Sequence, residues 1–171
     1  RLIGMAHRKC VSVAAAKKDF EHLSKGKSLR SKVKWLGVMG YTDPVRSGVK
    51  SALNKAEKAG IAVTVITGDY RETAVAVMGE LGITVSDAQI IEGHELEKMT
   101  DSQLETVVQD VLLFARTKPS QKLRIVKALQ KKGDVVAMMG DGVNDAPAIA
   151  AAEIGLVVGD ASDIARESAD I

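Results

Sequence analysis

The sequence Val135-Val-Ala-Met-Met-Gly-Asp-Gly-Val-Asn-Asp-Ala-Pro147 carries more structural information than any other part of this chain. It starts with five apolar residues that do not alternate with polar ones, which is typical of a β-strand covered on both faces. Gly140 and Gly142 follow and allow the backbone to turn sharply. Asn144 suits the N-cap of a helix, and Pro147 suits its first turn because no N–H is needed there. The pattern therefore predicts a buried strand, a tight loop and a helix.

Two aspartates lie in this loop. The predicted arrangement points Asp141 and Asp145 from the carboxyl end of the strand towards one small volume. Closely spaced carboxylate oxygens suit a hard cation such as Mg²⁺, which usually takes one or two carboxylates and completes its shell with water and phosphate. The alternative is a pair of turn aspartates, one of which caps the helix. The glycines and the strand–loop–helix context favour the metal.

Outside this stretch, apolar runs alternate with segments of helical spacing. Strands are expected at 35–39, 61–66, 111–115, 135–139 and 154–158, and helices between 44 and 60 and at 71–81, 101–108, 119–131, 146–152 and 163–169. Such alternation forms βαβ units, so the predicted fold class is α/β with a doubly wound parallel sheet. Before this region, residues 2–5 and 11–16 are expected to pair as a short hairpin. Residues 17–34 are expected to be a polar, basic connecting segment.

The composition limits the classes of function. The 171 residues fit one ordinary domain, and an apolar content of 46% is typical of a globular protein with a buried core. A net charge of +2 and 3% aromatic residues argue against nucleic acid as a partner. The single Cys10 excludes an internal disulfide and fits a reducing compartment. No apolar run approaches the roughly 18 residues of a membrane span and no signal-peptide pattern is present, so the chain as given is expected to be soluble.

Parallel sheets bind ligands beyond the carboxyl ends of their strands. Applied to the predicted sheet, this rule gathers Asp43, Thr67, Gly68, Asp69, Arg116, Lys122, Asp141, Asn144 and Asp145 along one edge. Thr67 and Gly68 offer a hydroxyl and a backbone N–H before a helix, which favours an anion; the alternative is a strand-end turn capped by Asp69. Lys122 lies early in a helix, where the helix dipole disfavours a cation, and it is either functional or an ordinary surface lysine. A phosphate-sized slot, a lysine and carboxylates for Mg²⁺ together favour phosphoryl transfer.

Three motifs, preceded by Asp43-Pro-Val-Arg46, resemble the phosphorylation domain of P-type cation-transporting ATPases, which belong to the haloacid-dehalogenase-like group. The motifs are Thr67-Gly68-Asp69, Phe114-Ala-Arg-Thr-Lys-Pro-Ser-Gln-Lys122 and Met139-Gly-Asp-Gly-Val-Asn-Asp-Ala-Pro147. The resemblance implies a Rossmann-like, haloacid-dehalogenase-like sheet over most of the chain. Asp43-Pro44 and Phe114-Ala-Arg116 look closer to the calcium and sodium/potassium pump branches than to heavy-metal pumps. Residues 1–32 are expected to be the tail end of a nucleotide-binding domain with a connector, and 33–171 the C-terminal part of the phosphorylation domain.

The resemblance also implies roles for the residues at the predicted edge. Thr67 and Gly68 would hold the oxygens of an aspartyl-phosphate, and Lys122 would neutralise the phosphoryl group. Asp141 would ligate Mg²⁺, with Asp145 acting in the same catalytic set.

The remaining residues would bind cofactors. Asn144 would support the metal and phosphate shell beside Asp145. Asp43 and Arg46 would receive the ribose and phosphate end of ATP, with help from Arg116, and Asp69 belongs to the same cofactor-binding group. The implied reaction is ATP hydrolysis through an aspartyl-phosphate, coupled to transport of a cation, with calcium as the expected ion.

The sequence differs from the family at one motif. The family's phosphorylated aspartate lies in Asp-Lys-Thr-Gly-Thr at the end of the first strand, and this sequence contains no such motif. The sheet is therefore expected to be incomplete at its N-terminal strand, with an unpaired central position. The chain is expected to be a fragment of a larger pump on the cytoplasmic side of a membrane, which it reaches through transmembrane helices absent here.

Two alternatives stay open. The first is a non-catalytic module that binds Mg²⁺ and phosphate or nucleotide, completed by another chain that supplies the nucleophile. The second is a soluble haloacid-dehalogenase-like phosphatase, which would lack its nucleophile here.

Overall fold

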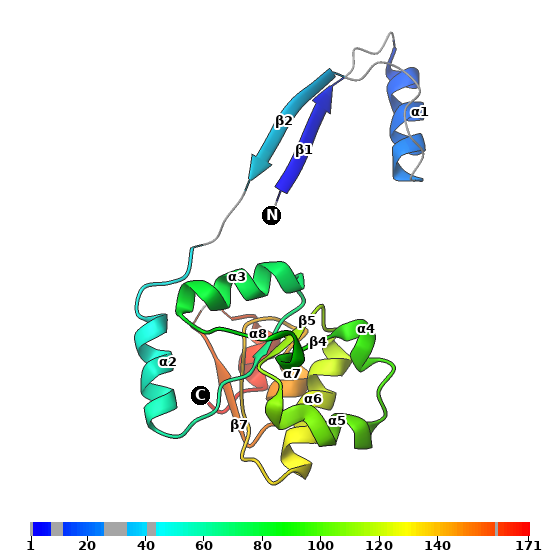
Figure 1. The fold of residues 1–171 in the computed structure, drawn as a ribbon. Helices are drawn as coiled ribbons and strands as arrows, with labels where there is room; N and C mark the ends of the chain where they lie inside the picture. Colours follow the sequence, from blue (N-terminus) through cyan, green and yellow to red (C-terminus); the bar gives the residue numbers. More distant parts are fainter. Residues whose placement is uncertain (1, 8–11, 26–33, 41–43, 160) are drawn as a thin grey trace. The chain divides into compact units, whose positions relative to one another are not determined.

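A computed structural model describes residues 2–7, 12–25, 34–40, 44–159 and 161–171. The chain divides into two compact units, residues 1–44 and residues 45–171. Figure 1 shows the elements of both units.

The first unit contains a two-stranded antiparallel sheet and a helix. Strand β1 (Leu2–His7) pairs with β2 (Lys34–Gly40), and the register shifts between Met5 and Ala6. Helix α1 (Val13–Ser24) begins after Ser12, whose hydroxyl accepts a hydrogen bond from the N–H of Ala15. The predicted hairpin between residues 2–5 and 11–16 is therefore wrong, because a capping serine followed by three alanines favours a helix. The strand predicted at 35–39 is present, but it pairs with β1.

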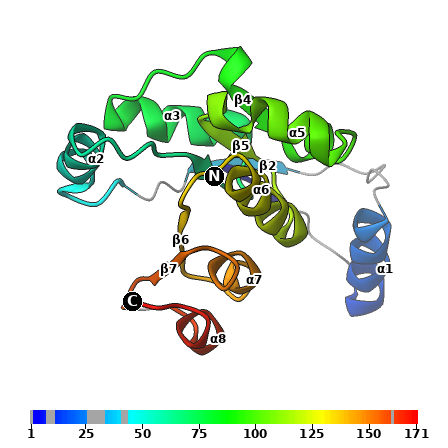
Figure 2. The same ribbon diagram turned by 90° about the horizontal axis from the view of Figure 1, so that it is seen from below.

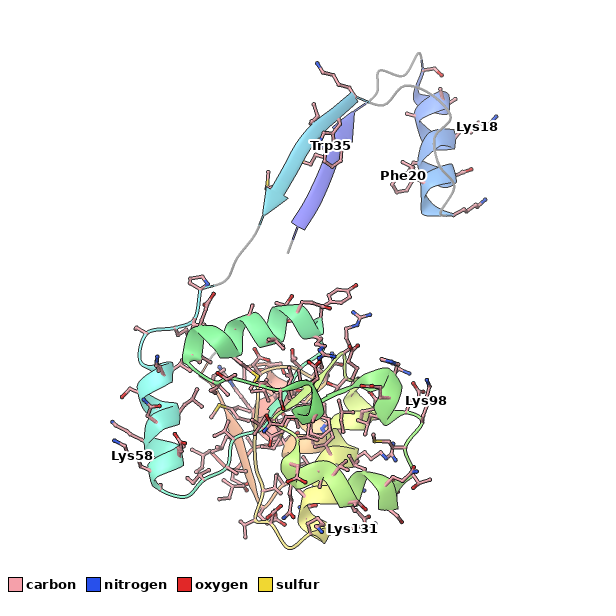
Figure 3. All side chains as sticks on the ribbon, in the orientation of Figure 1. Lys18, Phe20, Trp35, Lys58, Lys98 and Lys131 are labelled. Carbon is pink, nitrogen blue, oxygen red and sulfur yellow. The ribbon has the colours of Figure 1, made fainter. Side chains whose placement is uncertain are left out.

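Large apolar side chains of the first unit are exposed. Phe20 on α1 and Trp35 on β2 project from their elements (Figure 3), and 74% and 61% of their surfaces are exposed. Leu36 on β2 is also exposed.

The second unit contains two parallel sheets. The first has the strand order β3 (Val65–Ile66), β5 (Leu113–Ala115), β4 (Ile90–Glu92), and the second pairs β6 (Ala137–Gly140) with β7 (Ile154–Val157). The strand predicted at 61–66 pairs over two residues only. Strand β4 was not predicted, because its three residues lie in a region of mixed polar sequence.

Helices connect these strands. They are α2 (Val49–Lys58), α3 (Arg71–Leu81), α4 (Gly93–Leu96), α5 (Asp101–Val107), α6 (Pro119–Lys131), α7 (Ala146–Ile149) and α8 (Asp163–Glu167), with short 3₁₀ segments at Asp87–Gln89 and Val108–Asp110. The predicted bounds of α3 and α6 are confirmed. Gly82 ends α3 in the left-handed conformation at φ 86°, and Pro119 begins α6. The predicted helix at 146–152 is shorter than expected.

Helices cover both faces of the three-stranded sheet. Leu113 and Ala115 on β5 pack against α3, in a cluster with Ala74 and Met78. Phe114, between them on the strand, packs on the opposite face in a cluster that includes Leu104 of α5 and Ile125 of α6. Alternate residues of β5 thus enter different cores. The predicted doubly wound α/β fold is confirmed.

The β6–β7 sheet is covered on one face. Met138 is buried against α6, α7 and α8, and Figure 2 shows α7 and α8 beside this sheet. Ala137 and Met139 point to the other side and are exposed, with 63% of Met139 accessible. The prediction that this strand is covered on both faces is wrong, since no layer of the described residues packs on the Met139 side.

Strands β3 and β6 each have an edge that pairs with no other strand of the described residues. Among the described residues, β3 pairs only with β5, and β6 pairs only with β7. Ile66 on β3 packs against the core cluster of each sheet, so β3 is the strand of the first sheet that contacts the core beside β6. The sheet is therefore incomplete between β3 and β6, in agreement with the predicted unpaired central position.

Candidate functional site

Lys122 and Asp145 form an ion pair between α6 and the start of α7. The Nζ atom of Lys122 lies 2.6 Å from Oδ1 of Asp145, and 14% and 10% of the two side chains are exposed. Charged side chains are seldom so buried unless they are paired. The pair therefore joins two of the predicted catalytic residues in direct contact.

The loop before α7 fixes Asp145. Its N–H donates a hydrogen bond to the carbonyl of Gly142 at 3.0 Å, and its Oδ2 accepts a long one from the Gly142 N–H at 3.4 Å. The carbonyl of Asp145 accepts hydrogen bonds from the N–H groups of Ala148 and Ile149. Asp145 is the N-cap residue of α7, so the prediction of Asn144 at this position is wrong. Residues 143–145 form a turn, which delays the helix by one residue.

Asp141 and Asn144 lie in the same loop and are exposed. The carbonyl of Asp141 accepts a hydrogen bond from the N–H of Ser162, and Ser162 caps α8. This contact fixes the backbone just after β6. The Asp141 carboxylate remains open to solvent, on the loop that also carries Asp145.

A second loop carries Thr67, Gly68 and Asp69 from β3 to α3. The Oγ1 atom of Thr67 accepts a hydrogen bond from the N–H of Asp69 at 3.1 Å. The carbonyl of Thr67 accepts hydrogen bonds from the N–H and the hydroxyl of Thr117, both at 3.0 Å. Gly68 and Asp69 are exposed. The loop is thus stabilised by one internal hydrogen bond and by two hydrogen bonds from Thr117, in the segment that leads into α6.

Arg116 follows β5 and lies against this second loop. Its N–H donates a hydrogen bond to the carbonyl of Asp69 at 3.0 Å. Its guanidinium carbon lies 4.2 Å from the centre of the Tyr70 ring. The structure therefore brings Arg116 to the Thr67–Asp69 loop, as predicted from the carboxyl-edge rule.

Two residues that hold these loops together, Thr117 and Gln121, are absent from the prediction. Gln121 is buried, and its side chain donates a hydrogen bond to the carbonyl of Gly93 at 2.7 Å and accepts one from the N–H of Lys118 at 2.9 Å. A residue with a side-chain acceptor three positions after the N-cap is a recognised capping pattern, and Lys118 to Gln121 has this spacing. That signal could have identified Gln121. Thr117 has no comparable signal.

The predicted residues form two groups joined by the start of α6. Lys122 contacts Asp145, and Arg116 contacts the loop of Thr67 and Asp69. Thr117 is bonded to Thr67 and leads through Lys118 into the helix that carries Lys122. Arg46 is exposed in the segment before α2. Asp43 lies outside the described residues.

Residues 4–153 match the model of a family described as haloacid dehalogenase-like hydrolases. The chain belongs to this family. The match spans most of the second unit, including both loops of the candidate site.

Curated relatives of this haloacid dehalogenase-like chain are calcium-transporting ATPases. It is 44% identical over 138 residues to calcium-transporting ATPase type 2C member 1 of Homo sapiens, which covers 80% of this chain and 15% of the relative. It is 39% identical over 154 residues to calcium-transporting ATPase 1 of Bacillus cereus, covering 90% of this chain and 17% of the relative. The chain thus spans less than a fifth of the length of these relatives. The predicted resemblance to cation-transporting ATPases is confirmed.

The fold is shared with a solved structure described as the catalytic domain of the CPx-ATPase CopB-B. The TM-score is 0.54, the sequence identity is 24%, and the similarity covers 81% of this chain and 42% of the other. Among the described residues, no helix combines the length and the apolar character that crossing a membrane requires.

The oxygen donors of this haloacid dehalogenase-like site fit a Mg²⁺ ion that shares its shell with phosphate. Among the described residues, no three His, Cys, Asp or Glu side chains are grouped as metal ligands. The donors after β6 are the exposed carboxylate of Asp141 and the carboxylate of Asp145, which is paired with Lys122. Mg²⁺ usually takes one or two carboxylates, with water and phosphate completing its shell. The donor set therefore suits magnesium bound together with an anion.

Proposed function

We propose that this chain is part of the cytoplasmic catalytic portion of an ATP-driven P-type cation pump, and that the transported ion is calcium. The buried ion pair of Lys122 and Asp145, on the loop that also presents Asp141, carries the proposal. The pair and Asp141 supply a cation and carboxylates at the carboxyl ends of parallel strands, where α/β folds bind ligands. The calcium-transporting relatives support the choice of ion.

The chemistry of each residue follows from its position. Lys122 neutralises negative charge on the phosphoryl oxygens, and Asp145 holds its ammonium group in place. The N–H of Gly68 and the hydroxyl of Thr67 donate to oxygens of the same group, while the hydroxyl oxygen still accepts the hydrogen bond from the N–H of Asp69. Asp141 and Asp145, supported by Asn144, hold Mg²⁺, which lowers the cost of bringing anionic groups together when it is bound. Positioning and charge neutralisation are the main contributions that protein makes to phosphoryl transfer.

In the proposal, the nucleotide binds beside the Thr67–Asp69 loop. Arg116 contacts the phosphate or ribose end of ATP beside the Asp69 loop. The resemblance to P-type ATPases also assigns Asp43 and Arg46 to ATP binding. Residues 1–32 are the tail end of a nucleotide-binding domain with its connector; the exposed side chain of Phe20 supports this, because a large apolar side chain on a surface suits a packing partner.

The phosphorylated aspartate comes from a strand outside this sequence. The unpaired edges of β3 and β6 and the exposed Met139 support a missing strand between the two sheets. In the proposal this strand belongs to the same, longer pump, which reaches the membrane through further segments. If another chain supplies it, the protein is instead a binding module, and the reading frame upstream of Arg1 distinguishes the two cases.

Titration with Mg²⁺ and ATP, followed by the amide signals of the whole chain in NMR, tests the proposal. The largest shifts are expected at Gly68, Arg116 and Gly142. Lys122→Ala is expected to weaken binding on the order of tenfold, because it removes the cation that meets the phosphate. Lys127→Ala is the matched control, since Lys127 is an exposed lysine on the same helix. Shifts confined to other surfaces, or equal binding by both variants, would overturn the proposal.

The chain alone is expected to form no phosphoenzyme, since it lacks the nucleophile motif. Incubation with ATP labelled at the γ-phosphate, followed by acid precipitation, measures this directly. Acid-stable label on the purified chain would contradict the assignment of the nucleophile to another segment.

A further inference from the structure

The side chains of Tyr70 and Arg116 are stacked at the edge of the candidate site. The guanidinium carbon of Arg116 lies 4.2 Å from the centre of the Tyr70 ring, within the range of a cation–π interaction. Tyr70 is the N-cap residue of α3, but its side chain makes no capping hydrogen bond, and 63% of the residue is exposed. Neither capping nor burial in the core therefore explains a tyrosine at this position.

The backbone of Arg116 adopts an uncommon conformation. Arg116 has φ 54°, and among the described residues it is the only non-glycine residue with a positive φ. Non-glycine residues in the left-handed region are uncommon and persist where the surroundings fix them. Such positions are frequent at binding sites.

Three contacts fix this conformation. The N–H of Arg116 donates to the carbonyl of Asp69, and the next N–H, of Thr117, donates to the carbonyl of Thr67. On the other side, Gly93 lies so close that a Cβ atom there would be 2.2 Å from the carbonyl oxygen of Arg116. The backbone is therefore held between the Thr67–Asp69 loop and the start of α4, and it sets the direction in which the side chain leaves.

The charge of Arg116 is available to a ligand. Among the described residues, Arg116 takes part in no ion pair, whereas the neighbouring Lys118 is paired with Glu97 at 2.8 Å. Stacking on Tyr70 occupies one face of the guanidinium group and leaves its N–H groups free to donate. Planar N–H groups of this kind bind phosphate and carboxylate oxygens in pairs.

We propose that Tyr70 is a positioning residue, whose ring holds the guanidinium group of Arg116 in place to bind an anionic oxygen of the nucleotide. The inference rests on the proposed function, because it takes the Thr67–Asp69 loop as part of the nucleotide site. The aromatic ring matters and the hydroxyl group does not. Loss of the ring frees the arginine side chain and weakens nucleotide binding without changing the fold.

The spectroscopic test does not depend on nucleotide. Ring currents of Tyr70 should shift the NMR signals of the Arg116 side chain in the whole chain. Tyr70→Phe should retain these shifts, and Tyr70→Leu should abolish them. Unchanged signals in Tyr70→Leu would overturn the stacking itself.

The binding test uses Mg²⁺ and ATP with the same variants. Tyr70→Leu is expected to weaken binding about threefold, which is the size of an exposed cation–π contact, and Tyr70→Phe is expected to restore it. In an Arg116→Ala background, Tyr70→Leu should have no further effect, because the ring acts only through Arg116. Urea unfolding should be nearly unchanged in all Tyr70 variants.

The outcomes separate the two proposals. Absence of ATP binding by the unaltered chain counts against the proposed function. Binding by the unaltered chain that Tyr70→Leu leaves intact, or a loss that persists after Arg116 is removed, counts against the positioning role of Tyr70.

Discussion

Gly140 leaves no space for a side chain beside Asp145. A Cβ atom on Gly140 would lie 2.5 Å from the Cβ of Asp145 and 2.9 Å from its Oδ2. The clash involves an atom next to the backbone, so a change of rotamer at Asp145 cannot relieve it. The last residue of β6 must therefore be glycine for Asp145 to lie against the strand and contact Lys122.

Replacing Gly140 with alanine should displace Asp145 and lower the free energy of unfolding by about 1 to 3 kcal/mol, as overpacked sites do. Urea denaturation measures the loss, and the amide spectrum locates it in the loop before α7. Gly142→Ala is the control in the same loop, because the nearest atom to its Cβ would be Oδ2 of Asp145, at an ordinary 3.6 Å. Equal stability of both variants would show that the loop adjusts freely.

The buried pair of Lys122 and Asp145 should show a larger coupling free energy than an exposed pair. A double-mutant cycle with Lys122→Met and Asp145→Asn is expected to give about 2 kcal/mol, because removing one partner leaves the other charge poorly solvated. Urea unfolding of the four proteins measures it.

Lys131 and Glu105 provide the matched pair for this cycle. They lie 2.8 Å apart, but 61% of the lysine side chain is exposed, at the surface end of α6 (Figure 3). The expected coupling is much smaller than that of the buried pair, because solvent screens exposed charges. Similar values for the two pairs would contradict the importance of burial.

Neighbouring methionines on β6 should respond differently to truncation. Met138→Ala is expected to destabilise the chain by about 2 to 4 kcal/mol, since Met138 is buried in the core beside α6 and α7. Met139→Ala should change stability by no more than about 0.5 kcal/mol, because its side chain is exposed. Thermal or urea unfolding compares them. A large loss at Met139 would mean that something covers this face.

Glu153 should make the stability of the chain depend on pH. Its pKa lies below the 4.5 of an ordinary glutamate, mainly because the N–H of Val136 donates a hydrogen bond to the carboxylate at 2.8 Å. A carboxyl group whose pKa is lowered by folding stabilises the fold above its unfolded pKa, and this contribution is lost as the pH falls through the folded value. The free energy of unfolding should therefore drop as the pH falls below 4.5. The start of β6 should loosen first.

Glu153→Gln should reduce this acid dependence, since its amide does not titrate. Glu80→Gln, at an exposed position on α3, serves as the control. Urea unfolding over a series of pH values gives the comparison. Parallel curves for the unaltered chain and Glu153→Gln would contradict the assignment.

The elements that could be predicted have clear local signals at both ends. Helix α6 begins at Pro119, and α3 ends at Gly82, so their bounds follow from residues that start or stop helices. The pairing of β1 with β2 could not be predicted, because it joins segments that are far apart in the sequence. The exposed face of β6 could not be predicted for a similar reason. An apolar run indicates that both faces of a strand can be buried, but it does not show whether a neighbouring element is present to bury them.

The candidate site also has a part that the sequence predicts and a part that it does not. The rule that ligands bind at the carboxyl ends of parallel strands predicts from the sequence alone that Lys122 and Asp145 lie at one edge of the sheet. It did not indicate the stacking of Tyr70 on Arg116. That contact depends on a left-handed arginine held by a loop and by the close approach of Gly93, and neither leaves a local pattern.

The two free borders of β3 and β6 have a consequence for handling the protein. Unpaired backbone N–H and C=O groups along a strand are templates for any extended polypeptide, including a second molecule of the same chain. Concentrated samples will therefore tend to associate through these borders. A soluble preparation needs a peptide or a tethered segment that occupies the gap, or dilute conditions that leave it empty.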